Sequence, residues 1–518
     1  MWHAARPGRT SWNMMSKAHP PATPSEGLAG VAIDGSAWTT AQAVVSKVAV
    51  LAATWVVALK LLESDVAVAA LVMTATKVLC VLPPLNMGDV LVARGAGFRA
   101  CTAAAARVVL SWSVLIVLGI AALSPVLGSF YSHYPRGLFV ALLCIAGLRV
   151  LGESLQVIPL VHLRMAFRYR RVALIDGGVQ LVASITTIVL AWSGAGAWSL
   201  VGPLAAAAFA KALLYRWAID DSGPVDPADD DARSVSRDFR LAGGAQYVHS
   251  LVDTAPLLII GRCSDDIQTG LFAFAFNLAA QANAIVGGQL SGVLQPVLAS
   301  LAHAGERQVA GFLRTLRVLS AVIVPVCLTQ AVLAEPLFRV VFPERWLPSA
   351  PVFAMLCLSE ALFFAAAPTM ALLRAQGRFS AFLAWQGIHL LVSVVLLPIA
   401  AWKAGALGVA MTTTGLWAVS LPLAVMLAVR PGGVGPRTAL TVFFTPWITC
   451  VPIVAMAWFV VRWLDDQSRL GAWIALVSVG PLAFGAMVVG FRWTQPATYS
   501  DLTMIAGRIV GRVLRRRA

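Results

Sequence analysis

Long apolar segments follow one another through most of the chain, from residue 38 to residue 491. A helix needs about 20 apolar residues to cross the hydrocarbon layer of a membrane, and about fourteen segments are long enough. Hydrophobic residues make up 59% of the 518 residues and charged residues 12%, against about 45–50% and about 25% in soluble domains. We therefore expect an all-α polytopic membrane protein, and the composition excludes a soluble enzyme and a disulfide scaffold. The expected spans are 38–62, 66–92, 104–127, 138–163, 172–192, 196–219, 239–261, 267–300, 311–334, 349–373, 379–402, 405–429, 438–463 and 471–491.

These spans form two groups of six, followed by two more. The polar stretch between the groups contains Pro224, Pro227 and a run of aspartates, which is typical of a loop. The first residues are polar and lack the apolar core of a signal peptide, so we expect a disordered tail or a true start at Met14 or Met15. The expected divisions are a disordered cytoplasmic N-terminus (1–37), an N-terminal six-helix bundle (38–219), a cytoplasmic inter-bundle loop (220–238), a C-terminal six-helix bundle (239–429), two additional transmembrane helices (438–491) and a basic amphipathic tail (492–518).

Positive charge is distributed unevenly along the chain. Lysine and arginine number 39 against 24 acidic residues, which gives a net charge of +15. Most of these cations fall at alternate ends of the expected spans, with clusters at 164–171 and in the final residues. The positive-inside rule then predicts that both termini are cytoplasmic. We expect a multi-pass protein of a bacterial inner membrane and no nucleic-acid partner.

Motifs of known chemistry are missing from the sequence. The seven cysteines are scattered and form no CxxC pair, so neither a metal site nor a disulfide framework is expected. The chain has no HExxH, no GxSxG and no phosphate-binding P-loop. The longest expected outside connection, 335–348, is too short for a catalytic domain. We therefore expect no catalytic residues, no cofactor and no enzyme activity, although a membrane polysaccharide polymerase or ligase remains a minor alternative.

An internal repeat relates the two six-span groups. The segment LRMAFRYRRVALIDGGVQLV begins at Leu163, and LRAQGRFSAFLAWQGIHLLV begins at Leu373. Further along, Gly196-Ala197 aligns with Gly405-Ala406, and 64–66 aligns with 265–267. Six spans are an even number of crossings, so the two halves share one orientation. Parallel repeats of this kind are typical of transporters that bind substrate between their halves.

Three stretches make the chain resemble the multidrug/oligosaccharidyl-lipid/polysaccharide exporter superfamily, and within it the Wzx-type polysaccharide-biosynthesis branch. They are the arginine-rich loop at 164–171, the turn GAGAWSLV at 194–201, and the stretch from Asp253 to Arg262. The resemblance covers about residues 38–430. It implies a fold of two six-helix bundles that flips a lipid-linked oligosaccharide, on a polyprenyl pyrophosphate, across the inner membrane by alternating access. It implies membrane lipids and polysaccharide-assembly proteins as partners, and H⁺ or Na⁺ as a coupling ion.

Polar residues inside the spans recur on single helix faces. A charge at the bilayer centre costs about 2.5–3.5 kcal/mol on insertion scales, so such residues face a cavity or a partner. If the substrate is a lipid pyrophosphate, cations would hold its phosphates and amides its sugars. The candidates for substrate binding in a cavity are Lys47, Lys77, Arg149, Asn277, Gln281 and Gln289.

A second group of intramembrane residues is assigned to coupling or to pairing between helices: Asp253, His249, Glu153, Asp176 and Glu360. Several alternatives stay open. Arg149 and Glu153 lie at i and i+4 and are spaced to pair with each other. Lys77 either pairs with an acid or extends its amine toward water. Asp253 either pairs with Lys47 or exchanges a proton, and His249 is a packing residue or a proton relay.

Two further functions compete with flipping. A multidrug antiporter of the same superfamily needs an acidic, aromatic cavity for cationic drugs, whereas the first half of this chain carries intramembrane lysine and arginine. A membrane scaffold that transports nothing has no need for charged residues on the faces of its spans. Both alternatives are therefore ranked below a lipid-linked oligosaccharide flippase.

Overall fold

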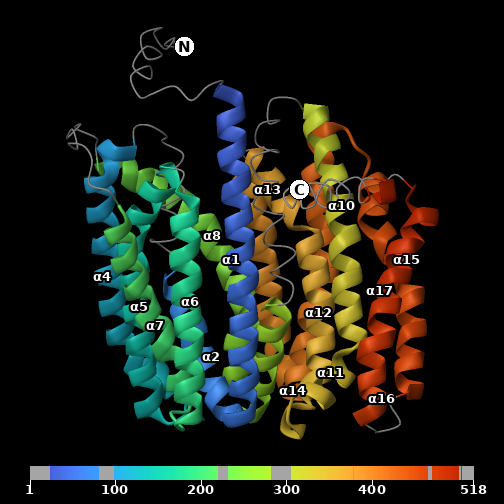
Figure 1. Ribbon diagram of the computed structural model, residues 1–518, viewed down its shortest axis with the longest axis horizontal. Helices are drawn as coiled ribbons and strands as arrows, with labels where there is room; N and C mark the ends of the chain where they lie inside the picture. Colours follow the sequence, from blue (N-terminus) through green and yellow to red (C-terminus); the bar gives the residue numbers. More distant parts are fainter. Residues whose placement is uncertain are drawn as a thin grey trace, which may run out of the picture.

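The computed structural model describes residues 24–80, 91, 98–166, 168–219, 232–281, 305–376, 378–464, 469–496, 498–500 and 503. Helices dominate the described residues, which contain no strand, and ten helices are long and apolar enough to cross a membrane. Figure 1 shows them side by side with their axes roughly parallel. The expected all-α polytopic membrane fold is confirmed.

The first half of the chain contributes α1 (Pro24–Lys60), α2 (Glu63–Cys80), α4 (Phe98–Phe130), α5 (Arg136–Met165), α6 (Tyr169–Trp192) and α7 (Trp198–Ala218). The second half contributes α8 (Ala232–Cys263), a helix over 266–281, α10 (Gly305–Val332), α12 (Ser349–Ala365), α13 (Ala367–Ala375) and α14 (Phe379–Val429). Then follow the short η4 (Arg430–Gly432), α15 (Pro436–Leu464), α16 (Arg469–Ile474), the π-helical η5 (Ala475–Val479) and α17 (Gly480–Thr494). Between α10 and α12 lie α11 (Ala334–Val341) and the 3₁₀ turn η3 (Glu344–Trp346).

Helix is found at each expected span, but parts of 66–92 and 267–300 lie outside the described residues. α14 contains two expected spans, 379–402 and 405–429. Its backbone leaves the helical conformation at Ala404 and Gly405, where the chain turns back. The two segments are therefore separate crossings joined by a tight turn.

Two expected boundaries are wrong where the structure describes them. α1 begins at Pro24, so residues 24–37 are helical rather than disordered. Proline is tolerated in the first turn of a helix, and no proline follows it to stop the helix. α8 begins at Ala232, inside the expected loop 220–238, because that loop has no proline after Pro227. Residues 1–23 and 220–231 lie outside the described part, as does most of the expected tail at 492–518.

The two halves repeat the same turns. Arg168 and Arg378 have nearly equal backbone angles (φ/ψ −85/47° and −85/51°). Each donates its backbone N–H to the carbonyl five residues earlier, on Leu163 and Leu373, at 2.9 and 3.0 Å. Gly196 and Gly405 both have φ of 54°. The sequence repeat is therefore also a structural repeat.

Packing between helices follows the same repeat. α1 packs on α6, and α8 packs on α14 in the second half. Likewise α4 packs on α5, and α10 packs on α12. The added helices α15 and α17 pack on each other and on α10, beside the second half (Figure 1).

Exposed tryptophans mark two levels along the helices. We call the end where α11 and α16 lie, the lower end in Figure 1, the α11 end. One set of exposed tryptophans lies where α6, the first segment of α14 and α15 end: Trp192, Trp402 and Trp463. At the opposite end of their helices lie Trp217 and Trp493. Tryptophan is enriched at both membrane–water interfaces, so these levels indicate where the headgroups lie. The apolar surfaces between them face lipid.

The turn inside α14 provides a test of the repeat's backbone geometry. A Cβ at Gly405 would lie 2.5 Å from Oε1 of Gln268, and its positive φ disfavours any side chain. We expect Gly405→Ala to lower the free energy of unfolding by about 1–3 kcal/mol. Thermal unfolding of the purified protein in detergent measures the change. Gly415→Ala, in the same helix and facing open space, is the control. Equal melting temperatures for both variants would contradict the expectation.

Candidate functional site

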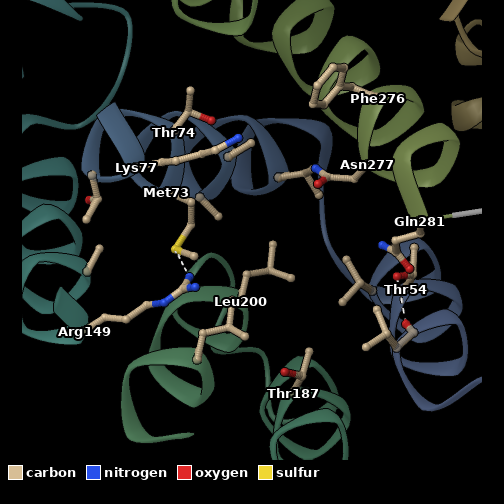
Figure 2. A pocket seen from close by; sticks show the side chains of 18 of the residues that line it. Thr54, Met73, Thr74, Lys77, Arg149, Thr187, Leu200, Phe276, Asn277 and Gln281 are labelled. Atoms are coloured by element: carbon tan, nitrogen blue, oxygen red, sulfur yellow. Dashed lines mark hydrogen bonds between the residues drawn. The ribbon is translucent and has the colours of Figure 1, made fainter. Parts of the chain in front are cut away.

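A cavity of about 550 Å³ lies where the first half faces α8 and the helix over 266–281. α1, α2, α5, α6 and α7 form the rest of its wall. Apolar side chains cover most of the wall, and polar groups interrupt it at a few places (Figure 2). The polar and charged residues that line it are Thr54, Thr74, Thr76, Lys77, Arg149, Glu153, Gln180, Ser184, Thr187, Asp253, Thr254, Asn277 and Gln281. It is the place where the sequence predicts a substrate, between the two halves.

An ion pair connects the halves across this cavity. Nζ of Lys77, on α2, lies 2.6 Å from Oδ2 of Asp253, on α8. The side chains are 54% and 39% exposed, so both are accessible from the cavity. The sequence proposed Lys47 as a partner of Asp253, and the structure corrects this: the partner is Lys77. Of the two alternatives for Lys77, pairing with an acid is the one observed.

A second ion pair lies on the wall formed by α5. Nε of Arg149 lies 2.7 Å from Oε1 of Glu153, one turn further along the same helix, as the i, i+4 spacing predicts. The guanidinium also contacts the sulfur of Met73 at 4.0 Å. Figure 2 shows this contact across the cavity from α5 to α2. Met73 could not be assigned to the site from the sequence, because thioethers in apolar spans are most often packing residues.

The charges that line the cavity balance one another. Two cations, Lys77 and Arg149, face two carboxylates, Asp253 and Glu153, and each cation is within ion-pair distance of one carboxylate. The described part of the wall is therefore not a basic cleft. An anionic ligand would have to compete with the carboxylates for the two cations.

Amide groups supply neutral hydrogen-bonding capacity on the wall formed by 266–281. Asn277 and Gln281 lie one turn apart, and both line the cavity. Nδ2 of Asn277 donates to the carbonyl of Ala273 at 2.9 Å, which leaves its Oδ1 available. Oε1 of Gln281 is buried and has no hydrogen-bond partner among the described residues. Phe276 lines the cavity beside them. Gln289 lies outside the described residues.

Lys47 and Asp176 lie away from this wall. On α1 the lining begins at Val50 and continues through Thr54, so Lys47 is about one turn beyond it. Lys47 is half-buried, with no ion pair to a described residue. Asp176 pairs with Lys211 at 2.9 Å and joins α6 to α7, which fits its predicted alternative of interhelical pairing.

The polar residues of the second half form a separate cluster. Nδ1 of His249 lies 3.2 Å from Nε2 of Gln386, and its ring stacks on Phe363 with centroids 5.9 Å apart. His389 contacts Oγ of Ser420 at 2.9 Å. These contacts show His249 packing between α8 and α14. Neither His249 nor Glu360 lines the cavity.

Contacts between the halves join the end of α1 to α11 and η3. α1 ends at Lys60, so its last carbonyls have no partner within the helix. The Ala58 carbonyl accepts hydrogen bonds from Nη2 of Arg345 at 2.7 Å and Nε1 of Trp346 at 2.9 Å. Trp55 donates to the carbonyl of Val341 at 2.9 Å, and Trp346 is fully buried. We call this set of contacts the α1–η3 closure. These contacts could not be predicted from the sequence, because a helix-end carbonyl is present in every residue type.

Labelling tests whether water reaches the cavity. Asn277 is exposed to the cavity, whereas Ala279, two residues along the same helix, is fully buried. In a cysteine-free background, Asn277→Cys should react with a membrane-impermeant thiol reagent at least about tenfold faster than Ala279→Cys, since the thiolate must meet water to react. Mass spectrometry of the reacted protein measures the rates. An Asn277→Cys rate as slow as that of Ala279→Cys would contradict access of water to the cavity.

Comparison with known proteins places this geometry in context. The chain is 23% identical to an uncharacterized membrane protein in the cps region of Klebsiella pneumoniae, over 40% of this chain and 43% of that protein. It is 21% identical to the succinoglycan biosynthesis transport protein ExoT of Rhizobium meliloti (strain 1021), over 65% of this chain and 62% of that protein. The chain thus spans less than two thirds of the length of these curated relatives.

Two solved structures share the fold at low sequence identity. The lipid II flippase MurJ, in an inward closed conformation, superposes with a TM-score of 0.65 at 13% identity, over 89% of this chain and 99% of that one. An inward-facing multidrug resistance MATE family transporter of the MOP superfamily gives 0.55 at 14% identity, over 76% and 96%. The fold expected from the family resemblance is confirmed.

A family model described as polysaccharide biosynthesis protein matches residues 44–351. The matched region holds most of the cavity wall and the α1–η3 closure. Because the match covers more than half of the 518 residues, the chain belongs to this family of polysaccharide biosynthesis proteins.

Proposed function

We propose that this protein flips a lipid-linked oligosaccharide, carried on a polyprenyl pyrophosphate, across a bacterial inner membrane. Membership of a polysaccharide biosynthesis family supports this proposal, as does a relative named as a succinoglycan biosynthesis transport protein. The fold is that of a protein named as a lipid II flippase. The observation that carries the proposal is the cavity between the halves, bridged by Lys77 and Asp253.

The paired charges explain how an anionic headgroup can be bound and released. A pyrophosphate entering the cavity carries more than one negative charge, and it replaces Asp253 beside Lys77 and Glu153 beside Arg149. Before substrate enters, each cation is compensated, which avoids the cost of an unpaired charge in a low-dielectric site. The carboxylates then compete with the departing phosphates. Sugars hydrogen-bond to Asn277 and Gln281, and the polyprenyl tail stays in the bilayer.

Alternating access follows from the repeat. The arginine distribution indicates that both termini are cytoplasmic, which places the α11 end on the outer side. The α1–η3 closure then shuts the cavity toward the outside, and rocking of the halves must break it to release substrate. We propose H⁺ or Na⁺ as the coupling ion, whose gradient drives transport. No resident cofactor is proposed. The protein acts as a transporter, not an enzyme, and receives its substrate from polysaccharide-assembly proteins.

A multidrug or cation antiporter is the second candidate. The shared fold with a multidrug resistance transporter favours it, and Asp253 and Glu153 are carboxylates that a cationic drug can approach. Flipping of an anionic headgroup requires the cations of the two ion pairs, whereas export of a cationic drug requires their carboxylates. The substitutions below therefore distinguish them.

Lys77→Ala should reduce flipping of the lipid-linked oligosaccharide by about tenfold or more, because a charge-assisted contact to phosphate is lost. Lys47 lies about one turn beyond the residues that line the cavity, so Lys47→Ala should reduce flipping less than Lys77→Ala does. The measurement is mass spectrometry of the lipid-linked intermediate that accumulates in a deletion strain carrying each variant at equal membrane abundance.

The matched control for this prediction is Lys211→Met, which also removes an intramembrane lysine but does not line the cavity. The Lys211→Met variant should export the lipid-linked oligosaccharide at close to the wild-type level. Full export of the lipid-linked oligosaccharide by the Lys77→Ala variant would contradict an anion site at Lys77. Loss of drug efflux with Asp253→Asn, at unchanged oligosaccharide export, would favour the antiporter.

Locking the α1–η3 closure should stop transport. Trp55 and Val341 lie on opposite halves and are in contact at the α11 end. A Trp55→Cys/Val341→Cys variant treated with a bifunctional thiol reagent should lose nearly all flipping, since the halves can no longer separate there. Each single-cysteine variant, treated with the same reagent, is the control. Undiminished flipping in the crosslinked double variant would rule out opening at this end.

A further inference from the structure

A second cavity, of about 1250 Å³, opens at the α11 end of the second half. Its wall is formed by α10, α11, η3, α12, α14, α15 and α16, and it shares no lining residue with the first cavity. α11 and α16 pack on each other at this end (Figure 1). The cavity thus lies between the second half and the two added helices.

Three arginines lie on its rim. Nη2 of Arg339 is 2.8 Å from Oε1 of Glu335. The guanidinium of Arg462 lies over the ring of Trp458, 4.9 Å from its centroid. Arg469, the first residue of α16, is exposed and has no ion pair with a described residue. Among the described residues, Glu335 and Glu344 are the acidic groups on this wall, against the three arginines, so the described part of the rim carries one more positive than negative charge.

The deeper wall is apolar. Met355 on α12 and Leu407 and Met411, which follow the break in α14, line the cavity. Met411 is 53% exposed although it is a large apolar residue. Trp458 and Trp463, on α15, place the rim at the level of the headgroups. Arginines at the interface are suited to an anionic headgroup, and the apolar wall beneath them is suited to an acyl chain.

We propose that this cavity binds an anionic phospholipid from the leaflet at the α11 end. Its phosphate lies between Arg462 and Arg469, because the planar guanidinium donates paired hydrogen bonds to phosphate oxygens. Its acyl chain runs along Leu407 and Met411. The bound lipid joins α15 and α16 to α11 and so holds the added helices against the second half. This site does not depend on the proposed transport.

Native mass spectrometry of the full chain, purified in detergent and titrated with phosphatidylglycerol, tests the site. We expect a saturable first lipid in the wild type, bound about tenfold more weakly by Arg462→Gln/Arg469→Gln, which loses two charge-assisted contacts. Arg462→Lys/Arg469→Lys should keep most of the affinity. The control is Arg262→Gln, which removes an exposed arginine that also lies over an aromatic ring, Phe130, but outside this cavity.

Several outcomes would overturn the proposal. Equal binding of phosphatidylcholine would show that the site does not select a net negative headgroup. Displacement of the lipid by inorganic phosphate alone at millimolar concentration would show a site for phosphate rather than for a lipid. An equal loss in Arg262→Gln, or none in the double glutamine variant, would show only diffuse attraction to surface arginines.

Discussion

A hydrocarbon layer offers no hydrogen-bond partners, and this constraint shapes the whole molecule. Each backbone N–H and C=O within the membrane must be satisfied by the protein itself, which favours helices throughout the described chain. Helix ends leave carbonyls without partners within the helix, and these ends lie near the interfaces. The α1–η3 closure uses such an end: Ala58 and Leu59 accept hydrogen bonds from Arg345 and Trp346. The contacts between halves at this level therefore arise from the general problem of ending a helix.

The same constraint acts on charged side chains. An unpaired charge away from water is costly, so Lys77 and Arg149 each have a carboxylate within 3 Å. Lys211 and Asp176 satisfy the requirement without facing the cavity. Ion pairing alone thus does not identify a binding site. What sets Lys77 and Asp253 apart is that they come from different halves and remain accessible, so a change in the relative position of the halves must change their separation.

Sequence predicted the fold well because apolar length and repeat are local signals. The spans, the parallel repeat and the Arg149–Glu153 pair all follow from spacing along one segment. The partner of Asp253 could not be predicted in this way. Spacing fixes the face of α8 on which Asp253 lies, but it does not say whether α1 or α2 faces that side. The α1–η3 closure was missed for a related reason, because its acceptors are carbonyls, which every residue has.

In the proposed transport cycle, the position of the α1–η3 closure lowers the cost of opening it. Its acceptors sit at the end of α1, near the level marked by the exposed tryptophans, where water can replace Arg345 and Trp346 as donors. Breaking an equal number of hydrogen bonds in the middle of the bundle would leave buried polar groups without partners. The main cost of opening is then the exposure of Trp346 and the apolar residues around it. A closure built from hydrogen bonds at a helix end and apolar contacts around Trp346 keeps the halves together, while its polar part finds new partners as they separate.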